Sequence, residues 1–264
     1  MTAIVVAESV THLGPEVRGA VLVAGSHAGV IAAYYAARAG AGAVLLNDAG
    51  VGKDGAGIAG LAYLDGIGMA AAAVAHHSAR IGDGGDTLAR GVVSHVNATA
   101  AACGVAPGMS GREAAERLRV APAPRTSPPS YSEGRFLLHA AAGARDVWAL
   151  DSVGMIETAD AGRVLLIGSH AALHGARPDS ALAVDARAAA FHDAGNGAAG
   201  VTRLPVLAAR GIPAVAADGA TARIGDGRSL WDSGIVAHLN EPAARGGAKR
   251  GMTVREFALR AAQS

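Results

Sequence analysis

Cysteine, lysine and aromatic residues are scarce in this 264-residue sequence, which contains one cysteine, two lysines and 3% aromatic residues. The single cysteine, Cys103, excludes an intrachain disulfide framework and is typical of a reducing compartment. Basic and acidic residues are balanced at 23 and 22, and the sequence contains no basic run. Because there are also few aromatic side chains to stack on bases, we expect no nucleic-acid partner.

Long uninterrupted apolar runs are also missing. The longest apolar region, residues 19–46, is interrupted by His27, Arg38 and several glycines, whereas a membrane-spanning helix needs about 20 predominantly apolar residues. The first ten residues lack the basic start and the long apolar stretch of a secretion signal. We therefore expect a cytoplasmic protein that has no contact with a membrane.

Small residues, including 37 glycines, are abundant, and the sequence repeats itself. The segment "VLVAGSHAGV" at residue 21 returns as "VLLIGSHAAL" at residue 164, an offset of 164 − 21 = 143. The same offset relates four further pairs: "ARIGDG" at 79 and 222, "SHVN" at 94 and "AHLN" at 237, "GMSGRE" at 108 and "GMTVRE" at 251, and "ESV" at 8 and "DSV" at 151. Five matches at one offset indicate a tandem duplication.

The duplication predicts the domain organisation. We expect a first α/β repeat over residues 1–120, a Pro-rich linker over residues 121–134 and a second α/β repeat over residues 135–264. One segment departs from the common offset, because "NDAGVGKDG" at residue 47 matches "HDAGNGAAG" at residue 192, and 192 − 47 = 145.

Both repeats are expected to alternate strands with helices in the same way. The expected strands of the first repeat cover residues 3–9, 20–25, 43–48 and 68–75. The expected helices cover residues 29–40, 58–66 and 87–103, with a last helix after Ser110. The alternation predicts the α/β class, with two pseudo-symmetric units that each contain a mainly parallel sheet flanked by helices.

Two of the helix predictions depend on specific spacings. Over residues 87–103, a helix places four apolar residues on one stripe: Leu88, Val92, Val96 and Ala100. His95 and its counterpart His238 would then lie on helices, where we interpret them as structural. The last helix of each repeat begins with the pattern of a capping box, Ser110-x-x-Glu113 and Thr253-x-x-Glu256.

The repeated polar residues are predicted to meet at one edge of each sheet. In the first repeat they follow the second, third and fourth strands: Ser26 and His27, then Asp48, then Arg80 and Asp83. Ligands bind at the carboxyl ends of strands in open α/β sheets, because loops and helix N-termini converge there. This edge is therefore the expected ligand site.

The Ser-His pairs at Ser26-His27 and Ser169-His170 allow two interpretations. In the catalytic interpretation, the serine is a nucleophile or a donor to a substrate oxygen, and the histidine is a general acid–base. In the structural interpretation, the serine caps the next helix. Adjacent residues in a turn rarely face each other, so a partner for Ser26 should come from another loop.

Asp48 and Asp193 also allow two interpretations, because each precedes a Gly-rich turn. Either carboxylate could act as a general base, a metal ligand or the group that orients a histidine. The alternative is an Asx-turn that holds the loop.

The Gly-rich segments "GVGKDG" and "GNGAAG", which contain Gly50, Gly52 and Gly195, fit the G-x-G-x-x-G pattern of dinucleotide sites. The aspartate just before the glycines would repel a pyrophosphate, which speaks against NAD. We expect these backbone amides to approach a ligand carboxylate or oxyanion instead. No cofactor is predicted. A divalent metal ion stays open because the ten histidines and the aspartates could build a site, although the loops lack H-x-x-x-H or H-x-H spacing.

Several charged residues differ between the repeats. Lys53 and Asp54 have no polar equivalents, Asn47 is replaced by His192, and His76-His77 corresponds to Gly219 and Ala220. With arginine at almost every other basic position, Lys53 is either a needed ammonium or base or a solvated loop residue. Arg80 with Asp83, and Arg223 with Asp226, form either a carboxylate clamp or a local ion pair.

These features predict an enzyme that acts on a small polar metabolite bearing a carboxylate or an amide. The first hypothesis is hydrolysis of a C–N or C–O bond at a site formed by the strand ends between the two repeats. A cofactor-free isomerase, racemase or lyase with paired Asp and His residues is the second hypothesis, and a non-catalytic small-molecule binding protein the third.

The candidate site residues fall into two groups. The expected catalytic residues are Ser26, His27, Asp48, Lys53, Ser169, His170 and Asp193. The expected substrate-binding residues are Gly50, Gly52, Asp54, Arg80, Asp83, His192, Gly195, Arg223 and Asp226. The expected partners are a small-molecule substrate and further copies of the chain. The second expectation comes from the helix that contains Val30, Ile31, Tyr34 and Tyr35, which is apolar nearly all round. Such a helix would be buried on several sides, either between the units or in a homo-oligomer.

Overall fold

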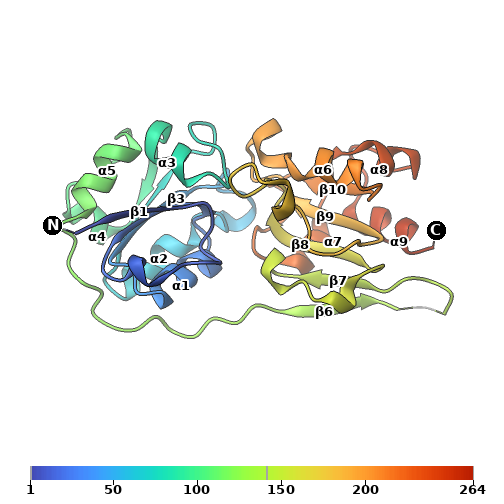
Figure 1. Cartoon of the computed structure of the whole chain (residues 1–264), viewed down its shortest axis with the longest axis horizontal. Helices are drawn as coiled ribbons and strands as arrows, with labels where there is room; N and C mark the ends of the chain where they lie inside the picture. The colour runs from blue at the N-terminus through green and yellow to red at the C-terminus, as the bar shows by residue number, and fades with distance from the viewer. Residues whose placement is uncertain (1, 141, 264) are drawn as a thin grey trace. The chain divides into compact units, whose positions relative to one another are not determined.

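The structure is a computed structural model that describes residues 2–140 and 142–263. The chain forms two compact units, which run from blue to green and from yellow to red in Figure 1. Unit 1 consists of Met1–Val51 and Gly55–Ser132, and unit 2 of Gly52–Asp54 and Glu133–Ser264. Both units are α/β, and each contains a mainly parallel sheet flanked by helices, as the sequence predicts.

Unit 1 contains a five-stranded sheet in the order β1-β2-β3-β4-β5. Strands β1 to β4 are parallel, and β5 is antiparallel to β4. The strands are β1 (Ile4–Ala7), β2 (Val21–His27), β3 (Ala43–Asn47), β4 (Ala70–Val74) and β5 (Val93–Val96). The helices are α1 (Val30–Arg38), α2 (Ala59–Gly66), α3 (Gly84–Arg90), α4 (Ala98–Ala102) and α5 (Gly111–Leu118), with the 3₁₀ turns η1 (Pro15–Val17) and η2 (Lys53–Gly55).

Alternating side chains divide the core of unit 1 between the two faces of the sheet. Leu22 and Ala24 on β2 pack with α1 and α2, whereas Val21 and Val23 pack with α4 and α5. This period of two is that of a strand buried on both faces. Figure 1 shows α1 and α2 on one side of the sheet and α3 and α5 on the other.

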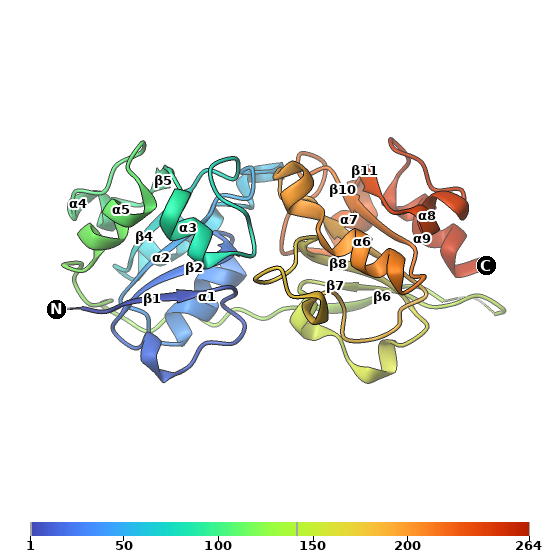
Figure 2. The same cartoon turned by 45° about the horizontal axis from the view of Figure 1, so that its top comes forward.

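Unit 2 contains a six-stranded sheet in the order β11-β10-β9-β8-β7-β6. Strands β7 to β10 are parallel, whereas β6 and β11 are antiparallel edge strands; Figure 2 shows β6 as the outermost strand beside β7. The strands are β6 (Arg135–His139), β7 (Val147–Leu150), β8 (Val164–His170), β9 (Ala188–His192), β10 (Ala214–Ala217) and β11 (Val236–Leu239). The helices are α6 (Arg203–Ala209), α7 (Gly227–Ser233), α8 (Glu241–Arg245) and α9 (Val254–Gln263). The 3₁₀ turns are η3 (Val153–Met155), η4 (Thr158–Asp160), η5 (Pro178–Ser180) and η6 (Gly197–Val201).

The expectation that both units alternate strands and helices in the same way is wrong for the segment between β8 and β9. Unit 1 has α1 between the corresponding strands, whereas unit 2 has turns and the short η5. Gly175 and Pro178 disfavour a helix here. The buried Arg203 packs against this segment instead, and its Nε donates to the carbonyl of Ala172 at 2.9 Å.

The predicted helix over residues 87–103 is also wrong. The chain forms α3, then β5, then α4, so His95 and His238 lie on strands β5 and β11. Helix α3 ends at Gly91, whose ψ of 139° leaves the helical region. The apolar spacing of the predicted stripe is also compatible with the β-branched residues of a short antiparallel strand, and Val92 is 41% exposed.

The two predicted helix starts after Ser110 and Thr253 are confirmed. Ser110 Oγ accepts the backbone N–H of Glu113 at 3.2 Å at the start of α5. At the start of α9, Thr253 Oγ1 accepts the N–H of Glu256 at 3.1 Å and Glu256 Oε2 accepts the N–H of Thr253 at 2.9 Å. Among the described residues, no helix has both the length and the apolar character to cross a membrane.

Candidate functional site

The repeated Ser-His pairs lie inside strands β2 and β8, not in turns after them. Ser26 Oγ accepts the backbone N–H of Val10 at 3.0 Å, and Ser169 Oγ accepts that of Val153 at 3.0 Å. The N-cap residue of α1 is Gly29, which has no side-chain capping bond, so Ser26 is not a helix cap. Both serines anchor the connection that precedes their strand.

The histidines of these pairs are buried beside the serines. His27 is 7% exposed, and its Nδ1 accepts the N–H of Gly29 at 3.0 Å. His170 is 4% exposed, and its ring packs edge-on against His174 at a centroid distance of 5.7 Å. These contacts place both imidazoles in local packing at the start of the following segment.

Glycine precedes each Ser-His pair because another loop lies directly against it. A Cβ atom on Gly25 would lie 2.2 Å from the backbone nitrogen of Asp83, and one on Gly168 would lie 2.5 Å from that of Asp226. In unit 1, Gly82 N–H donates to the Gly25 carbonyl at 2.7 Å. In each unit, the "GSH" segment therefore packs directly against the "ARIGDG" segment, and this contact explains why the two segments recur together.

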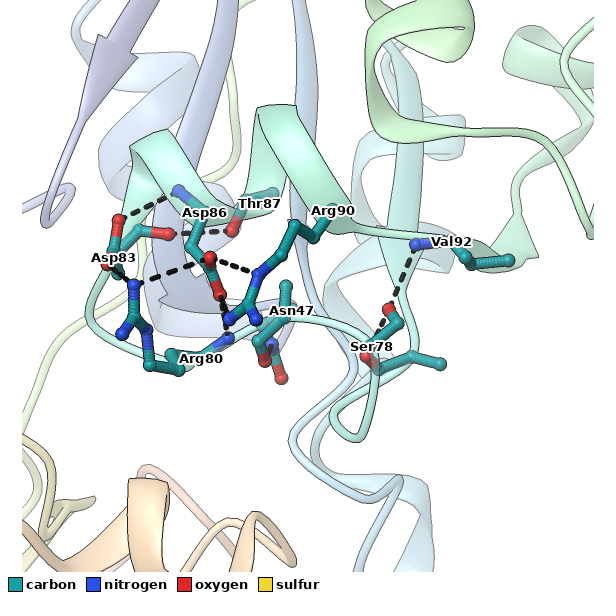
Figure 3. A network of polar contacts seen from close by, with 10 residues as sticks. Asn47, Ser78, Arg80, Asp83, Asp86, Thr87, Arg90 and Val92 are labelled. Atoms are coloured by element: carbon teal, nitrogen blue, oxygen red, sulfur yellow. Dashed lines mark hydrogen bonds and ion pairs between the residues drawn. The ribbon is translucent and has the colours of Figure 1, made fainter.

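The "ARIGDG" loop of unit 1 is a network of ion pairs around the start of α3 (Figure 3). Asp83 caps α3 by accepting the N–H of Asp86 at 2.8 Å, and Arg80 Nη2 lies 3.1 Å from Asp83 Oδ2. The buried Asp86 accepts Arg90 Nε at 2.6 Å and Arg80 N–H at 2.7 Å. The bond from Arg90 lowers the pKa of Asp86 below its usual value. Arg80 and Asp83 therefore form the local ion pair that one of their two interpretations predicts.

The corresponding loop of unit 2 has the same helix cap. Asp226 caps α7 by accepting the N–H of Ser229 at 3.0 Å. Arg223 Nη1 lies 3.6 Å from Asp226 Oδ2, and Arg223 Nε donates to Asp54 Oδ2 at 2.7 Å. This bond to Asp54 raises the pKa of Arg223.

The Gly-rich loop after β3 has four consecutive residues with positive φ: Ala49 (48°), Gly50 (71°), Val51 (62°) and Gly52 (69°). A β-branched residue in this region costs on the order of 1–3 kcal/mol and persists only where the surroundings enforce it. Here the amides turn toward the chain itself: Gly50 N–H donates to Asp48 Oδ1 at 3.0 Å and Val51 N–H to the Asp48 carbonyl at 2.8 Å. These amides hold Asp48 in place and are not aimed at a ligand.

Three residues of this loop, Gly52–Asp54, belong to unit 2 by their contacts. Lys53 Nζ donates to Ser233 Oγ at 2.7 Å, and Lys53 N–H donates to the Gly219 carbonyl at 2.9 Å. Lys53 is therefore a hydrogen-bonded side chain of unit 2, not a solvated loop residue.

Asn47 and His192, which differ in sequence, have equivalent contacts. Asn47 Oδ1 accepts the N–H of Ala49 at 2.9 Å, and Nδ2 donates to the carbonyl of Ala79 at 3.2 Å. His192 Nδ1 accepts the N–H of Ala194 at 2.9 Å, and Nε2 lies 3.0 Å from a backbone carbonyl oxygen. Burial lowers the pKa of His192, which is consistent with a neutral ring that donates from Nε2.

A cluster of polar side chains with acid–base chemistry surrounds Asp48, which directly follows β3 and is 3% exposed. Asp48 Oδ1 lies 2.9 Å from His76 Nδ1 and also accepts the N–H of His76 at 2.8 Å. Asp48 Oδ2 accepts Ser94 Oγ–H at 2.8 Å, and His95 Nδ1 lies 3.0 Å from the same Oγ. The Asx-turn predicted for Asp48 is confirmed by its bond from Gly50, but the carboxylate also holds a histidine.

We call Asp48, His76, Ser94 and His95 the Asp48 cluster; Asp48 is buried, and the other three residues are partly exposed. The side chain of His76 is 29% exposed, whereas that of Asp48 is 4% exposed. A buried carboxylate that accepts from Nδ1 fixes the ring orientation and tautomer, so that Nε2 carries the lone pair. This arrangement suits a general base.

Unit 2 keeps the aspartate and, as His238, the counterpart of His95, but it lacks the counterparts of His76 and Ser94. Asp193 Oδ1 accepts the N–H groups of Gly195 at 2.9 Å and Gly219 at 3.0 Å. The imidazole of His238 lies further away than that of His76 in unit 1, with its Nε2 3.8 Å from Asp193 Oδ2. Gly219 and Ala237 stand where unit 1 has His76 and Ser94.

His76, Ser94 and His95 are not among the candidate residues that the sequence predicts. His76 has no counterpart in the second repeat, and the apolar spacing predicts a helix over residues 94 and 95. The signal for Ser94 was the repeated "SHVN" and "AHLN", whose β-branched and apolar residues at alternate positions are typical of a strand.

No group of three or more His, Cys, Asp or Glu side chains within residues 2–140 and 142–263 is arranged to hold a metal ion. The chain matches no protein-family model, no curated protein and no solved structure. Function is therefore inferred from the contacts described above.

Proposed function

We propose that this protein is a hydrolase that cleaves a C–N or C–O bond of a small polar metabolite, with His76 as the general base. The observation that carries the proposal is the 2.9 Å contact between His76 Nδ1 and Oδ1 of the buried Asp48. A histidine held in this way is the usual general acid–base of hydrolytic sites, and such a group contributes about 10²- to 10⁴-fold to the rate.

The proposed step begins with water at Nε2 of His76. Nε2 takes a proton from the water as the water oxygen attacks the carbonyl carbon of the substrate. The C–N or C–O bond of the substrate then breaks. The imidazolium returns this proton to the leaving nitrogen or oxygen. Asp48 stabilises the imidazolium while it exists and does not itself take the proton.

Ser94 and His95 act as positioning residues for Asp48 in this scheme. Asp48 accepts four hydrogen bonds, from Gly50 N, His76 N, His76 Nδ1 and Ser94 Oγ. These four donors fix the two carboxylate oxygens in place. A fixed carboxylate is what an imidazolium next to it requires.

Arg80 is the candidate for binding a substrate carboxylate. It lies in the same loop as His76, and its side chain is 58% exposed. Its guanidinium now pairs with Asp83 at 3.1 Å. A guanidinium can bind a carboxylate through two parallel hydrogen bonds, and an exposed ion pair of this kind contributes little to stability, so a substrate can compete for it.

We also infer that the two units arose by tandem duplication and that unit 1 carries the activity. The bounds of several elements support the inference, since β2 begins at Val21 and β8 at Val164, and β5 begins at Val93 and β11 at Val236. Both pairs differ by 143. A unit that lacks His76 and Ser94 cannot form the Asp48 cluster, so Asp193 would keep only the Asx-turn role.

The test is the hydrolysis of 4-nitrophenyl acetate and of glycine 4-nitroanilide, an activated ester and an activated amide. We expect His76→Gln to lower kcat/KM by about 10²-fold or more, with an unchanged unfolding temperature. His12→Gln, at an exposed histidine, is the control and should leave kcat/KM unchanged. Equal rates for wild type and His76→Gln contradict the proposal.

Two other outcomes separate the alternative functions. Deuterium incorporation from solvent into a bound amino or hydroxy acid, without net conversion, would favour an isomerase or lyase. Saturable stabilisation by ligands with no turnover of any of them would favour a binding protein.

A further inference from the structure

All four tyrosines of the chain gather at one place in unit 1. Tyr34 and Tyr35 are on α1, with ring centroids 5.9 Å apart, and Tyr131 packs against Tyr34 at 6.4 Å. Tyr63 on α2 donates its hydroxyl to the Pro129 carbonyl at 2.6 Å. Burial and then the proximity of Tyr34 raise the pKa of Tyr63. We call this group the tyrosine cluster.

A cavity of unit 1 opens beside the tyrosine cluster. It has a volume of about 610 Å³ and is lined by the end of α1, by Ile67 and by the Pro-rich segment at residues 124–128. This volume is that of a small-molecule site, about 300–1,000 Å³. The lining residues Ala41 and Ile67 precede β3 and β4, so the cavity lies at the amino ends of these strands. Asp48 follows β3 at the opposite edge, so the cavity is separate from the Asp48 cluster.

Two guanidinium groups give the cavity a positive charge. Arg38 and Arg125 line it, and no Asp or Glu does. Among the described residues, neither arginine has a carboxylate within 4.0 Å. The C-terminal end of α1 adds roughly half a negative elementary charge. The two full positive charges outweigh it, so the cavity favours an anion.

The walls of the cavity are held in place before any ligand binds. Arg38 lies over the rings of Tyr34 and Tyr35, with its Cζ 5.9 Å from each centroid. Arg125 N–H donates to the Ile67 carbonyl at 2.8 Å, which fixes the Pro-rich segment against the loop before β4. Fixed groups lose little conformational entropy on binding a ligand.

We propose that this cavity is a binding site for a phosphate monoester that carries a flat ring, the class to which nucleoside monophosphates belong. Guanidinium groups bind phosphate oxygens through paired hydrogen bonds. The Tyr34 ring offers an apolar face on which a planar ring can stack. Thr126 and Ser127, which also line the cavity, add hydroxyl groups for the remaining phosphate or sugar oxygens.

The experiment uses the full chain with 3-fluorotyrosine in place of tyrosine and ¹⁹F NMR. All four fluorine resonances report on the tyrosine cluster, and that of Tyr34, which lines the cavity, reports on the cavity itself. The probes are AMP, UMP and phenyl phosphate, with adenosine and inorganic phosphate as the two halves of the ligand. We expect the phosphate monoesters to shift the Tyr34 resonance saturably, and the two halves to bind at least tenfold more weakly.

Arginine variants test whether the anion is recognised here. Arg38→Gln and Arg125→Gln should each weaken AMP binding at least tenfold, whereas Arg112→Gln, at an exposed arginine of α5, should not. The proposal is overturned if no monoester shifts the resonances at millimolar concentration, or if both cavity variants bind AMP as wild type does. It is also overturned if adenosine or inorganic phosphate alone binds as tightly as AMP.

Discussion

Asn47 and His192 make the same two hydrogen bonds with different chemical groups. Each accepts the backbone N–H two residues further along the chain, at 2.9 Å in both units. The amide of Asn47 donates to the carbonyl of Ala79, and the imidazole of His192 contacts that of Ala222. The two units therefore keep the same structural contact although the residue type differs.

This equivalence predicts how stability depends on pH. Burial lowers the pKa of His192 in the folded chain, so below about pH 6.5 the unfolded chain binds a proton that the folded chain does not. The free energy of unfolding should therefore fall as the pH decreases through this value, by at most about 1.4 kcal/mol per pH unit from this residue. His192→Asn should keep both contacts and flatten the dependence.

The measurement is urea unfolding of wild type and His192→Asn between pH 5 and pH 8. A variant whose free energy of unfolding falls as steeply as that of wild type below pH 6.5 would show that His192 is not the residue that titrates. His192→Leu serves as the destabilised control, because it leaves the N–H of Ala194 without its acceptor.

Gly25 should not tolerate even a methyl group. A Cβ atom there would lie 2.2 Å from the backbone nitrogen of Asp83 and 2.8 Å from the carbonyl oxygen of Glu8, and neither backbone can move easily. We expect Gly25→Ala to destabilise the protein by about 3 kcal/mol. Gly66→Ala is the matched control, because nothing lies within 4 Å of its Cβ position.

Gly66 is the last residue of α2, so alanine there should be neutral or stabilising by up to about 1 kcal/mol. Thermal unfolding of the two variants separates a steric effect from a general effect of replacing glycine. Similar losses of stability in both would contradict the close approach at Gly25.

The strands were predictable because their side chains are apolar over short runs between turn residues. β3 and β9 end one residue before the aspartates that the sequence marks; the capping box at Thr253 forms with both bonds, and at Ser110 the serine caps α5. Buried parallel strands need no contact outside the run to be recognised, since both faces are apolar. The same reasoning failed over residues 87–103, where an apolar spacing of four suits both a helix and a strand followed by a helix.

The Asp48 cluster was only half predictable, for a physical reason. Asp48 was marked by its place at a strand end, but its partners come from β5 and from the loop after β4. Side chains brought together by the antiparallel pairing of β5 leave no spacing signal in the sequence. Repetition was also misleading, because it marks residues that both units need for folding, such as Gly25 and Ser26.

Arg203 is predicted to be essential for the segment that replaces a helix in unit 2. Its side chain is fully buried, and burial lowers its pKa to about 10. The guanidinium donates to the carbonyls of Ala172, Ser180 and Ala181, and no carboxylate is among its contacts. Arg203→Met would leave these carbonyls unsatisfied and should cost about 3 kcal/mol.

Arg203→Lys should also destabilise, because an ammonium cannot reach carbonyls that a planar guanidinium holds together. Limited proteolysis gives a local measurement: we expect cleavage within residues 171–187 to speed up in both variants. Unchanged cleavage rates with a lowered unfolding temperature would place the effect of Arg203 elsewhere in the core.

The Asp48 cluster makes a graded prediction for catalysis, which depends on the proposed hydrolase activity. Asp48→Asn replaces a charged acceptor by an amide and removes the stabilisation of the imidazolium, so kcat should fall by about 10²-fold or more. Ser94→Ala removes the bond to Asp48 Oδ2 together with the contacts of the hydroxyl to the Ala73 carbonyl and to His95 Nδ1, so we expect a loss of about tenfold in kcat with little change in KM. Ser94→Thr keeps the hydroxyl and should recover most of the rate.

In unit 2, Asp193→Asn is the matched control for Asp48→Asn, because Asp193 forms the same Asx-turn without a histidine at 2.9 Å. Both variants should lose a similar amount of stability, and only Asp48→Asn should lose activity. The measurements are kcat and KM for 4-nitrophenyl acetate beside urea unfolding for each variant. Equal losses of activity in both would mean that the aspartates serve the fold alone, and the general base would then have to be sought outside the Asp48 cluster.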